Sequence, residues 1–243
     1  FAAVPADTWA GCQLLYICSP SNPSGTVIDM ATLQSLIERA DEYDFIIAAD
    51  ECYSELYADE TQPPVGLLQA CMALGRTDFK RCVVFHSLSK RSNVPGLRSG
   101  FVAGDADILR QFLLYRTYHG CAMSLAVQAA SIAAWQDETH VRENRDVYRQ
   151  KYDAVMAILG PVMDVTRPPA SFYLWPKTPV ADEPFARDLF AEQHVTVLPG
   201  SFLSRTAQGI NPGQNRVRLA LVASLAECVE AAKRIRYFIE NGN

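Results

Sequence analysis

The feature that most constrains the fold is a recurring pair: a short, largely apolar segment followed directly by polar side chains. Such segments occur at 13–18, 45–49 and 82–86. Continuous apolar runs of this length are typical of strands buried on both faces of a sheet. Apolar residues between the first two runs recur at helical spacing, which predicts a helix over 30–43. We therefore expect an α/β protein with a mostly parallel sheet in a three-layer α/β/α arrangement.

The rest of the chain predicts a second, smaller α/β unit after a helical region. Residues 124–159 read as a long helix with a break near Asp137. We expect a large domain over 1–142 and a small C-terminal domain over 143–243. Further strands are expected at 99–104, 172–175, 195–198 and 216–222, and further helices at 106–118, 182–193 and 224–239.

Composition excludes several classes of function. The 243 residues carry a formal net charge of −5, whereas nucleic-acid scaffolds need clustered positive charge. No apolar run approaches the roughly 20 residues that span a bilayer. The first residues lack the basic start and apolar stretch of a signal peptide, so a cytoplasmic protein is expected, without nucleic-acid or membrane partners.

The number and spacing of the cysteines also fit a cytoplasmic protein. The chain has seven cysteines, an odd number, and none is paired with another at CxxC spacing. Cys18 and Cys82 lie inside apolar runs. These features argue against structural zinc or a disulfide framework, and we expect no metal site and reduced, buried thiols.

Polar residues follow the first two predicted strands. In open α/β sheets, ligands bind beyond the carboxyl ends of the strands. Asn22, in the turn 22–25, can donate an amide hydrogen to a ligand oxygen, although an ordinary surface turn has the same composition. Asp50 at a buried strand end needs a cation or a donor, which a protonated pyridine nitrogen would supply; a helix cap is the alternative. Tyr53 could donate to a phenolic oxygen on the same ring.

The third strand leads to a lysine and a set of anion ligands. Lys90 stands just past the strand, where partial loss of hydration favours the uncharged, nucleophilic amine. Ser87, Ser89 and Arg98 can bind a phosphate, with Arg98 offering a rigid fork of donors. An amine beside a phosphate site suggests pyridoxal 5′-phosphate held as a Schiff base. Taken without the first two strands, Lys90 is better interpreted as a surface lysine.

Three segments, NPSG at 22–25, DECY at 50–53 and SLSK…GLRSG at 87–100, resemble the signatures of fold-type-I (class I/II) pyridoxal-phosphate aminotransferases. The resemblance implies a ping-pong transamination between an amino acid and a 2-oxo acid, with Lys90 as the residue that moves the proton. It also implies a homodimer with shared active sites. The implied cofactor ligands are Lys90 for the Schiff base, Asp50 for the pyridine nitrogen, Asn22 and Tyr53 for the ring oxygen, and Ser87 and Arg98 for the phosphate.

The resemblance also suggests a substrate. Arg218 matches the arginine that binds the substrate α-carboxylate; Arg216, one strand period away, is the competing candidate, and solvent-facing charges are the alternative for both. Residues 112–120 resemble most those of bacterial N-succinyldiaminopimelate aminotransferases of lysine biosynthesis. This implies N-succinyl-LL-2,6-diaminopimelate and 2-oxoglutarate as substrates. Arg116 would bind the distal carboxylate, or else serve only to stabilise a helix end.

Two departures from the family pattern stand out. Ser99 occupies a position that is usually aliphatic. Ahead of Asn22, the sequence has no equivalent of the phosphate-cradling turn, the ring-stacking aromatic residue or the tyrosine lent to the partner subunit. We therefore expect the C-terminal portion of a longer enzyme. Two alternatives remain: another reaction on this scaffold, such as β-elimination or decarboxylation, and an aminotransferase-like sensor domain of a transcriptional regulator.

Overall fold

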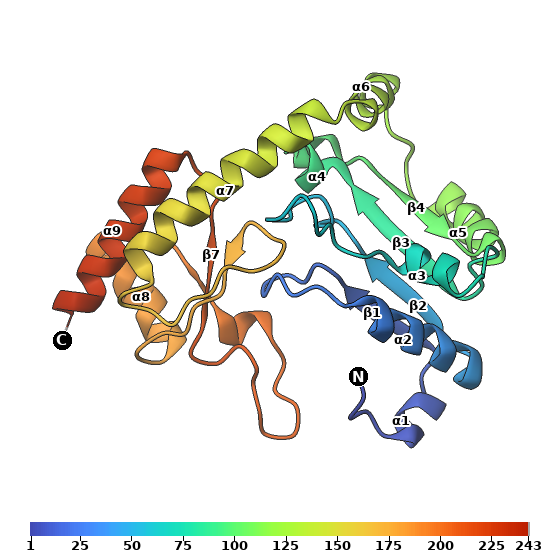
Figure 1. The fold of residues 1–243 in the computed structure, drawn as a ribbon, viewed down its shortest axis with the longest axis horizontal. Helices are drawn as coiled ribbons and strands as arrows, with labels where there is room; N and C mark the ends of the chain where they lie inside the picture. Colours follow the sequence, from blue (N-terminus) through green and yellow to red (C-terminus); the bar gives the residue numbers. More distant parts are fainter. Residues whose placement is uncertain (243) are drawn as a thin grey trace. The chain divides into compact units, whose positions relative to one another are not determined.

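The computed structural model describes residues 1–242, and Asn243, the last residue of the second expected domain, lies outside the described residues. Contacts divide the chain into two compact units (Figure 1). The first comprises 1–21 and 26–142, and the second comprises 22–25 and 143–243. The short turn 22–25 thus belongs to the second unit although the chain on both sides of it belongs to the first.

The first unit is built on a four-stranded sheet whose strands follow one another in chain order. Its first three strands are parallel, and the fourth is antiparallel to the third. The expectation of an α/β fold with a mostly parallel sheet is therefore confirmed. The strands are β1 (Leu14–Cys18), β2 (Ile46–Asp50), β3 (Cys82–Ser87) and β4 (Gly100–Gly104).

Helices α2 (Met30–Tyr43) and α3 (Leu67–Ala73) pack on one face of this sheet. The α2 helix begins at an Asp29 cap, which accepts the Thr32 N–H at 2.7 Å, and its apolar stripe is fully buried. Burying each such aliphatic side chain contributes roughly 1.5–3 kcal/mol. The sequence did not predict α3. Phe85, which points to the opposite face, meets Phe112 of α5 (Ala106–His119) with ring centroids 6.5 Å apart.

Shorter elements complete the first unit. They are α1 (Ala6–Ala10), the one-turn α4 (Leu88–Arg91) and a 3₁₀ turn over Pro95–Leu97. The predicted break in the long helix is confirmed, since α6 (Leu125–Gln136) ends before α7 (Thr139–Leu159) begins. Asp137 sets the new start by accepting the backbone N–H groups of residues 139 and 140.

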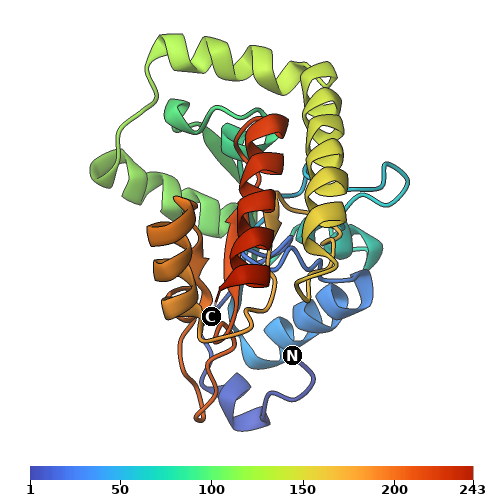
Figure 2. The ribbon, with the colours of Figure 1, turned by 90° about the vertical axis from the view of Figure 1, so that its left-hand side faces the viewer.

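The second unit has a three-stranded antiparallel sheet in the order β5 (Tyr173–Leu174), β7 (Val217–Ala220), β6 (Leu198–Pro199). Helices α7, α8 (Asp182–Gln193) and α9 (Leu225–Asn241) bury an apolar cluster against it. In Figures 1 and 2, α7 and α9 run side by side. The strand expected at 195–198 is wrong in extent, because only its last residue pairs in the sheet.

Among the described helices, none combines the length and apolarity that crossing a bilayer requires. All seven cysteines lie in the described part of the chain and are free thiols.

Asp182, at the start of α8, accepts hydrogen bonds from the backbone of the loop 200–216. The residue is 3% exposed, and its carboxylate accepts the N–H groups of Ser201 at 2.8 Å and Asn215 at 3.0 Å. Burial alone would raise the pKa of Asp182, but these donors hold that pKa below its ordinary value of 3.8. The charged form is therefore favoured by folding. Its contribution to stability is present above pH 3.8 and is lost as the pH falls through the lowered pKa.

We expect Asp182→Asn to lower the free energy of unfolding by about 2 kcal/mol at pH 7, because charge-assisted hydrogen bonds become neutral ones. The difference from the unmodified chain should shrink as the pH falls below about 4. Urea unfolding across this pH range measures both effects. Asp188→Asn, a partly exposed position on the same helix, should change stability much less. A constant difference across the pH range would contradict this account.

Candidate active site

The carboxyl ends of β2 and β3 and the end of β1 lie side by side. Asp50 is the register partner of Cys18 on one side and of Phe85 on the other. Side chains two residues apart in a strand share a face, so Tyr16 of β1 and Ser87 of β3 lie on the Asp50 face of the sheet. The sheet therefore gathers the polar residues that follow the strands at a single edge.

Asp50 is held by two donors, one on each carboxylate oxygen. The Tyr16 hydroxyl donates to Oδ2 at 3.3 Å, and the Cys52 backbone N–H donates to Oδ1 at 3.1 Å. Burial, followed by the charge of Asp50 and this hydrogen bond, raises the pKa of Tyr16 to about 12. No helix starts after Asp50, since turns follow it, so the helix-cap alternative does not apply. Tyr16 was missed from the sequence, although its period-two spacing from Cys18 was a usable signal.

Cys52 lies beside Asp50, whose carboxylate accepts the Cys52 backbone N–H. Burial and the neighbouring Asp50 raise the pKa of the Cys52 thiol to about 12, and the positive charge of Lys90 acts in the opposite direction. Tyr53, the next residue, is buried. The sequence offered no reason to single out Cys52.

Ser87 starts the short helix that carries Lys90. Its hydroxyl accepts the Ser89 N–H at 3.0 Å, donates to the Ser99 carbonyl at 3.1 Å, and lies 2.7 Å from the Ser89 hydroxyl. Lys90 is half-buried in the single turn of α4. The two serine hydroxyls and the backbone start of α4 thus lie together directly before the lysine.

The unusual Ser99 has a hydrogen-bond partner on another helix. Its side chain is buried, and its hydroxyl lies 2.7 Å from that of Ser131 on α6. A buried hydroxyl is tolerated when it is hydrogen-bonded, which explains how serine replaces an aliphatic residue here. The preceding residue, Arg98, is exposed, adopts a left-handed backbone conformation with φ of 52°, and donates to the Pro95 carbonyl at 2.8 Å.

The second unit brings Asn22 and Arg218 together. Arg218 donates to Asn22 Oδ1 at 2.9 Å, and its guanidinium lies 4.5 Å from the centre of the Tyr173 ring. Arg216, by contrast, donates to the Trp175 carbonyl at 2.8 Å. Arg218 therefore faces a side-chain amide and an aromatic surface, whereas Arg216 serves a backbone group. Tyr173 as a platform was not evident from the sequence.

Gly25 fits the turn 22–25 tightly into the second unit. The residue is buried, and its φ is +69°. A Cβ at this position would clash with the Pro168 Cβ and would lie 2.8 Å from the Ala170 carbonyl oxygen. Only glycine satisfies both the backbone conformation and this close approach, so the turn that carries Asn22 is fixed in place.

Arg116 lies at the C-terminal end of α5 and donates to the Cys121 carbonyl at 3.3 Å. Its guanidinium also lies against Gly120. The contact ties Arg116 to the segment that follows α5, and both interpretations predicted for this residue stay predictions.

The donor set of the first unit fits pyridoxal 5′-phosphate. The hydroxyls of Ser87 and Ser89, with Arg98 close by in the chain, suit a phosphate dianion. The Asp50 oxygens each accept one donor and keep lone pairs for a protonated pyridine nitrogen. Lys90 adds the amine that this cofactor requires. These groups come from adjacent strand ends of one sheet.

Comparison with known proteins gives the family. The model of aminotransferase class I and II matches residues 4–235. The LL-diaminopimelate aminotransferase of Nitratidesulfovibrio vulgaris (strain DSM 19637 / Miyazaki F) is 31% identical over 238 residues, which are 96% of this chain and 58% of that protein. The chain thus spans about three fifths of the length of this relative.

Solved structures agree with this match. An aminotransferase from Neisseria meningitidis Z2491 has a TM-score of 0.92 and 52% identity, over 98% of this chain and 60% of that one. A probable N-succinyldiaminopimelate aminotransferase from Thermus thermophilus has a TM-score of 0.84 and 29% identity, over 97% and 61%. The predicted resemblance is confirmed at the level of the family, whose members use pyridoxal 5′-phosphate. With its strand-end carboxylate, lysine and serines in the order of the family signatures, the chain belongs to the class I and II aminotransferases.

Proposed function

We propose that this chain forms the lysine-bearing part of a pyridoxal-phosphate-dependent aminotransferase, with 1–142 as the C-terminal portion of a three-layer cofactor domain and 143–243 as a small domain. One observation carries the proposal: the end of β2, with Asp50, is paired with the end of β3, which leads through Ser87 directly into the α4 turn that carries Lys90. A carboxylate and an amine at adjacent strand ends suit the two ends of one cofactor ring. The serine hydroxyls beside the lysine suit the phosphate of the same cofactor.

Each residue then has a distinct task. When bound, the cofactor supplies an electron sink for the carbanion that forms at the substrate α-carbon. Lys90 would remove the proton from the substrate α-carbon and then, as a general acid, deliver it to the C4′ carbon of the cofactor. Asp50, held by Tyr16 and Cys52, keeps the pyridine nitrogen protonated. The remaining proposed ligands are Asn22 and Tyr53 for the ring oxygen, Ser87, Ser89 and Arg98 for the phosphate, and Arg218 for the substrate α-carboxylate.

Covalent labelling tests the cofactor assignment. The full chain would be incubated with pyridoxal 5′-phosphate, reduced with borohydride and digested, and the modified lysine would be located by mass spectrometry. Labelling concentrated at Lys90 is the expected result. Labelling spread over exposed lysines such as Lys233 would refute the assignment. Addition of glutamate before reduction should remove the label from Lys90, because an amino donor displaces the lysine amine.

For the substrates, we propose N-succinyl-LL-2,6-diaminopimelate and 2-oxoglutarate, in lysine biosynthesis. The similarity to the Thermus thermophilus protein supports this choice. The Nitratidesulfovibrio vulgaris relative supports a second candidate donor, LL-diaminopimelate itself. Comparing kcat/KM for the two donors decides between them. A product that forms without any 2-oxo acid acceptor would instead indicate elimination or decarboxylation.

A homodimer is part of the proposal. Helix α5 exposes a set of large apolar side chains, and monomeric proteins rarely expose large contiguous apolar patches. Its members are Leu113, Leu114, Tyr115 and Tyr118. These side chains support an interaction surface on α5. We also place the enzyme in the cytoplasm, which the free thiols support.

Arg116 provides a test of substrate class. If Arg116 binds the distal carboxylate across the dimer, Arg116→Ala should lower kcat/KM for the succinylated donor and for glutamate by roughly tenfold or more, since a charge-assisted hydrogen bond is lost. Activity with alanine, which has no distal carboxylate, is the internal control and should stay within about twofold. If Arg116→Ala keeps the activity of the unmodified chain on all three donors, Arg116 has only the helix-end role.

A further inference from the structure

Three residues of the candidate active site have sequence neighbours that belong to one chain of contacts. Glu51 follows Asp50, His86 precedes Ser87, and Arg91 follows Lys90. Successive side chains of a strand point to opposite faces, so His86 turns away from the Ser87 side of the sheet. The contacts described below join these three neighbours through two aromatic residues. We call the five residues the support layer; they are Glu51, His86, Phe101, Trp135 and Arg91.

Glu51 and His86 join the ends of β2 and β3. Glu51 is 6% exposed, and its Oε2 lies 3.0 Å from His86 Nε2. Its other oxygen accepts the Leu67 N–H at 2.7 Å, at the start of α3. Both carboxylate oxygens are therefore satisfied, as a buried carboxylate requires. The pair fixes the ends of two strands relative to each other just where Asp50 and Ser87 are attached.

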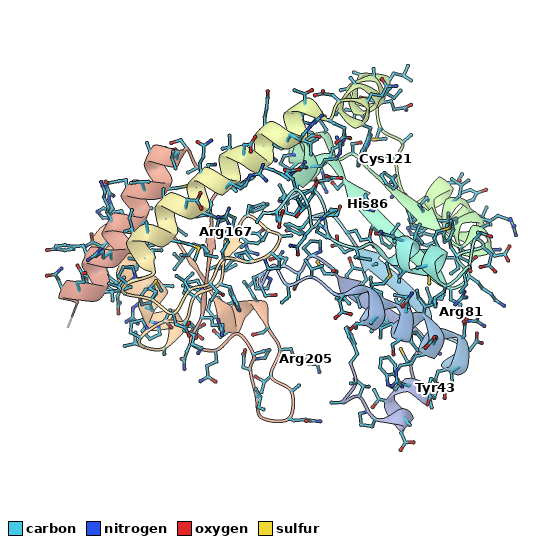
Figure 3. All side chains as sticks on the ribbon, viewed as in Figure 1. Tyr43, Arg81, His86, Cys121, Arg167 and Arg205 are labelled. Carbon is cyan, nitrogen blue, oxygen red and sulfur yellow. The ribbon has the colours of Figure 1, made fainter. Side chains whose placement is uncertain are left out.

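Aromatic contacts continue from His86 to α6. The His86 ring, labelled on β3 in Figure 3, stacks on Phe101 of β4 with centroids 4.9 Å apart. These two residues are direct register partners in the antiparallel pair. Phe101 in turn meets Trp135 of α6 at 5.1 Å. The Arg91 guanidinium lies 5.0 Å from the centre of the Trp135 ring, which completes the connection to α4.

Arg91, the residue after Lys90, joins α4 to α6. It is 4% exposed, donates to the Ala134 carbonyl at 2.7 Å, and forms an ion pair with Glu138. Helix α4 has four residues, far too few to be stable as an isolated helix. The orientation of Lys90 therefore depends on the Ser87 cap on one side and on Arg91 on the other.

We propose that the support layer sets the position of Asp50, Ser87 and Lys90, and that Arg91 is the positioning residue for Lys90. What Lys90 does chemically rests on the proposed function. The structural part of the proposal stands on the contacts alone.

The test compares Arg91→Met with Arg76→Met in the full chain. Arg76 is a matched control in the same unit, since its largely buried guanidinium pairs with Asp41 at 2.6 Å, away from α4. Amide hydrogen exchange would be measured without added cofactor. The Leu88 and Ser92 amides, bonded to the Ser99 and Leu88 carbonyls, should exchange roughly tenfold faster or more in Arg91→Met than in the control. Amides of β2 should not change, which separates local loosening from global destabilisation.

Exchange at α4 within about twofold of the Arg76→Met control would overturn the proposal. If Arg91→Met does not fold, Glu138→Gln replaces it, because that side chain is more than half exposed and its loss removes only the ion pair. Borohydride labelling with pyridoxal 5′-phosphate provides the second readout, in which Arg91→Met should lower the fraction of label at Lys90. Absence of that label in the unmodified chain would refute the proposed function, while the exchange result would still decide whether the support layer positions α4.

Discussion

Under the proposed function, Lys90→Ala is expected to abolish the visible absorption band of bound pyridoxal 5′-phosphate and to lower transamination by roughly 10⁴-fold or more. Two contributions are lost together. The alanine variant has no amine to hold the cofactor covalently. It also has no group on α4 to carry the proton, and general acid–base catalysis alone contributes about 10²- to 10⁴-fold. Absorption spectroscopy and glutamate turnover measure the two losses separately.

Lys233→Ala is the matched control, because Lys233 is an exposed lysine on α9. It should keep both the absorption band and the turnover. An added primary amine, such as methylamine, should restore part of the proton transfer in Lys90→Ala without restoring the covalent label. A Lys90→Ala chain that keeps the band would show that another lysine holds the cofactor, and the assignment of the site would then be wrong.

Arg218→Ala is expected to lower kcat/KM for the amino donor by about 100-fold, mainly through a higher KM. Removing one partner of a close, hydrogen-bonded charge pair costs about 2–5 kcal/mol, which corresponds to at least a 30-fold loss. The structure supports Arg218 over Arg216, because Arg218 lies on the Tyr173 ring and reaches Asn22, the proposed ring-oxygen ligand.

Arg216→Ala is the comparison that decides this assignment. Arg216 donates to the Trp175 carbonyl, so its loss should reduce stability slightly and leave KM nearly unchanged. Steady-state kinetics with a range of donor concentrations separates KM from kcat. A larger rise of KM in Arg216→Ala than in Arg218→Ala would reverse the roles of the two arginines.

The strands of the first unit could be predicted from the sequence because each is a short apolar run with a clear polar end. The direction of β4 could not be read in this way. An apolar run has the same composition in either orientation, and direction is decided by the connection. Here, residues 88–99 hold only a single helical turn and a 3₁₀ turn, which is too little for the helical crossover that a parallel partner needs.

In the second unit, the sequence predicts a strand that is longer than the one the structure contains. Val195 and Val197 alternate with polar residues, which predicts a strand over 195–198. Both valines do pack in the apolar cluster, but only Leu198 pairs in the sheet. Alternation reports which side chains are buried and carries no information on whether a neighbouring strand is present to receive the hydrogen bonds.

In the candidate site, the residue types were predictable and their mutual contacts were not. Lys90, Asp50 and Ser87 stand at strand ends that the pattern identifies. The side-chain donor to Asp50, Tyr16, comes from β1, and the partner of Ser99 comes from α6, at sequence separations of 34 and 32 residues. Such pairings depend on register and packing, which emerge only when the sheet is assembled.

The assignment of the turn 22–25 to the second unit has a consequence for any attempt to divide the protein. The chain passes between the units at 21–22, at 25–26 and again at 142–143, so neither unit is one uninterrupted stretch of sequence. A gene truncated after residue 142 would encode Gly25 without Pro168 and Ala170, the residues against which it fits. A gene starting at residue 143 would encode Arg218 without Asn22. Any rigid displacement of the second unit would carry Asn22 and Arg218 together as one piece.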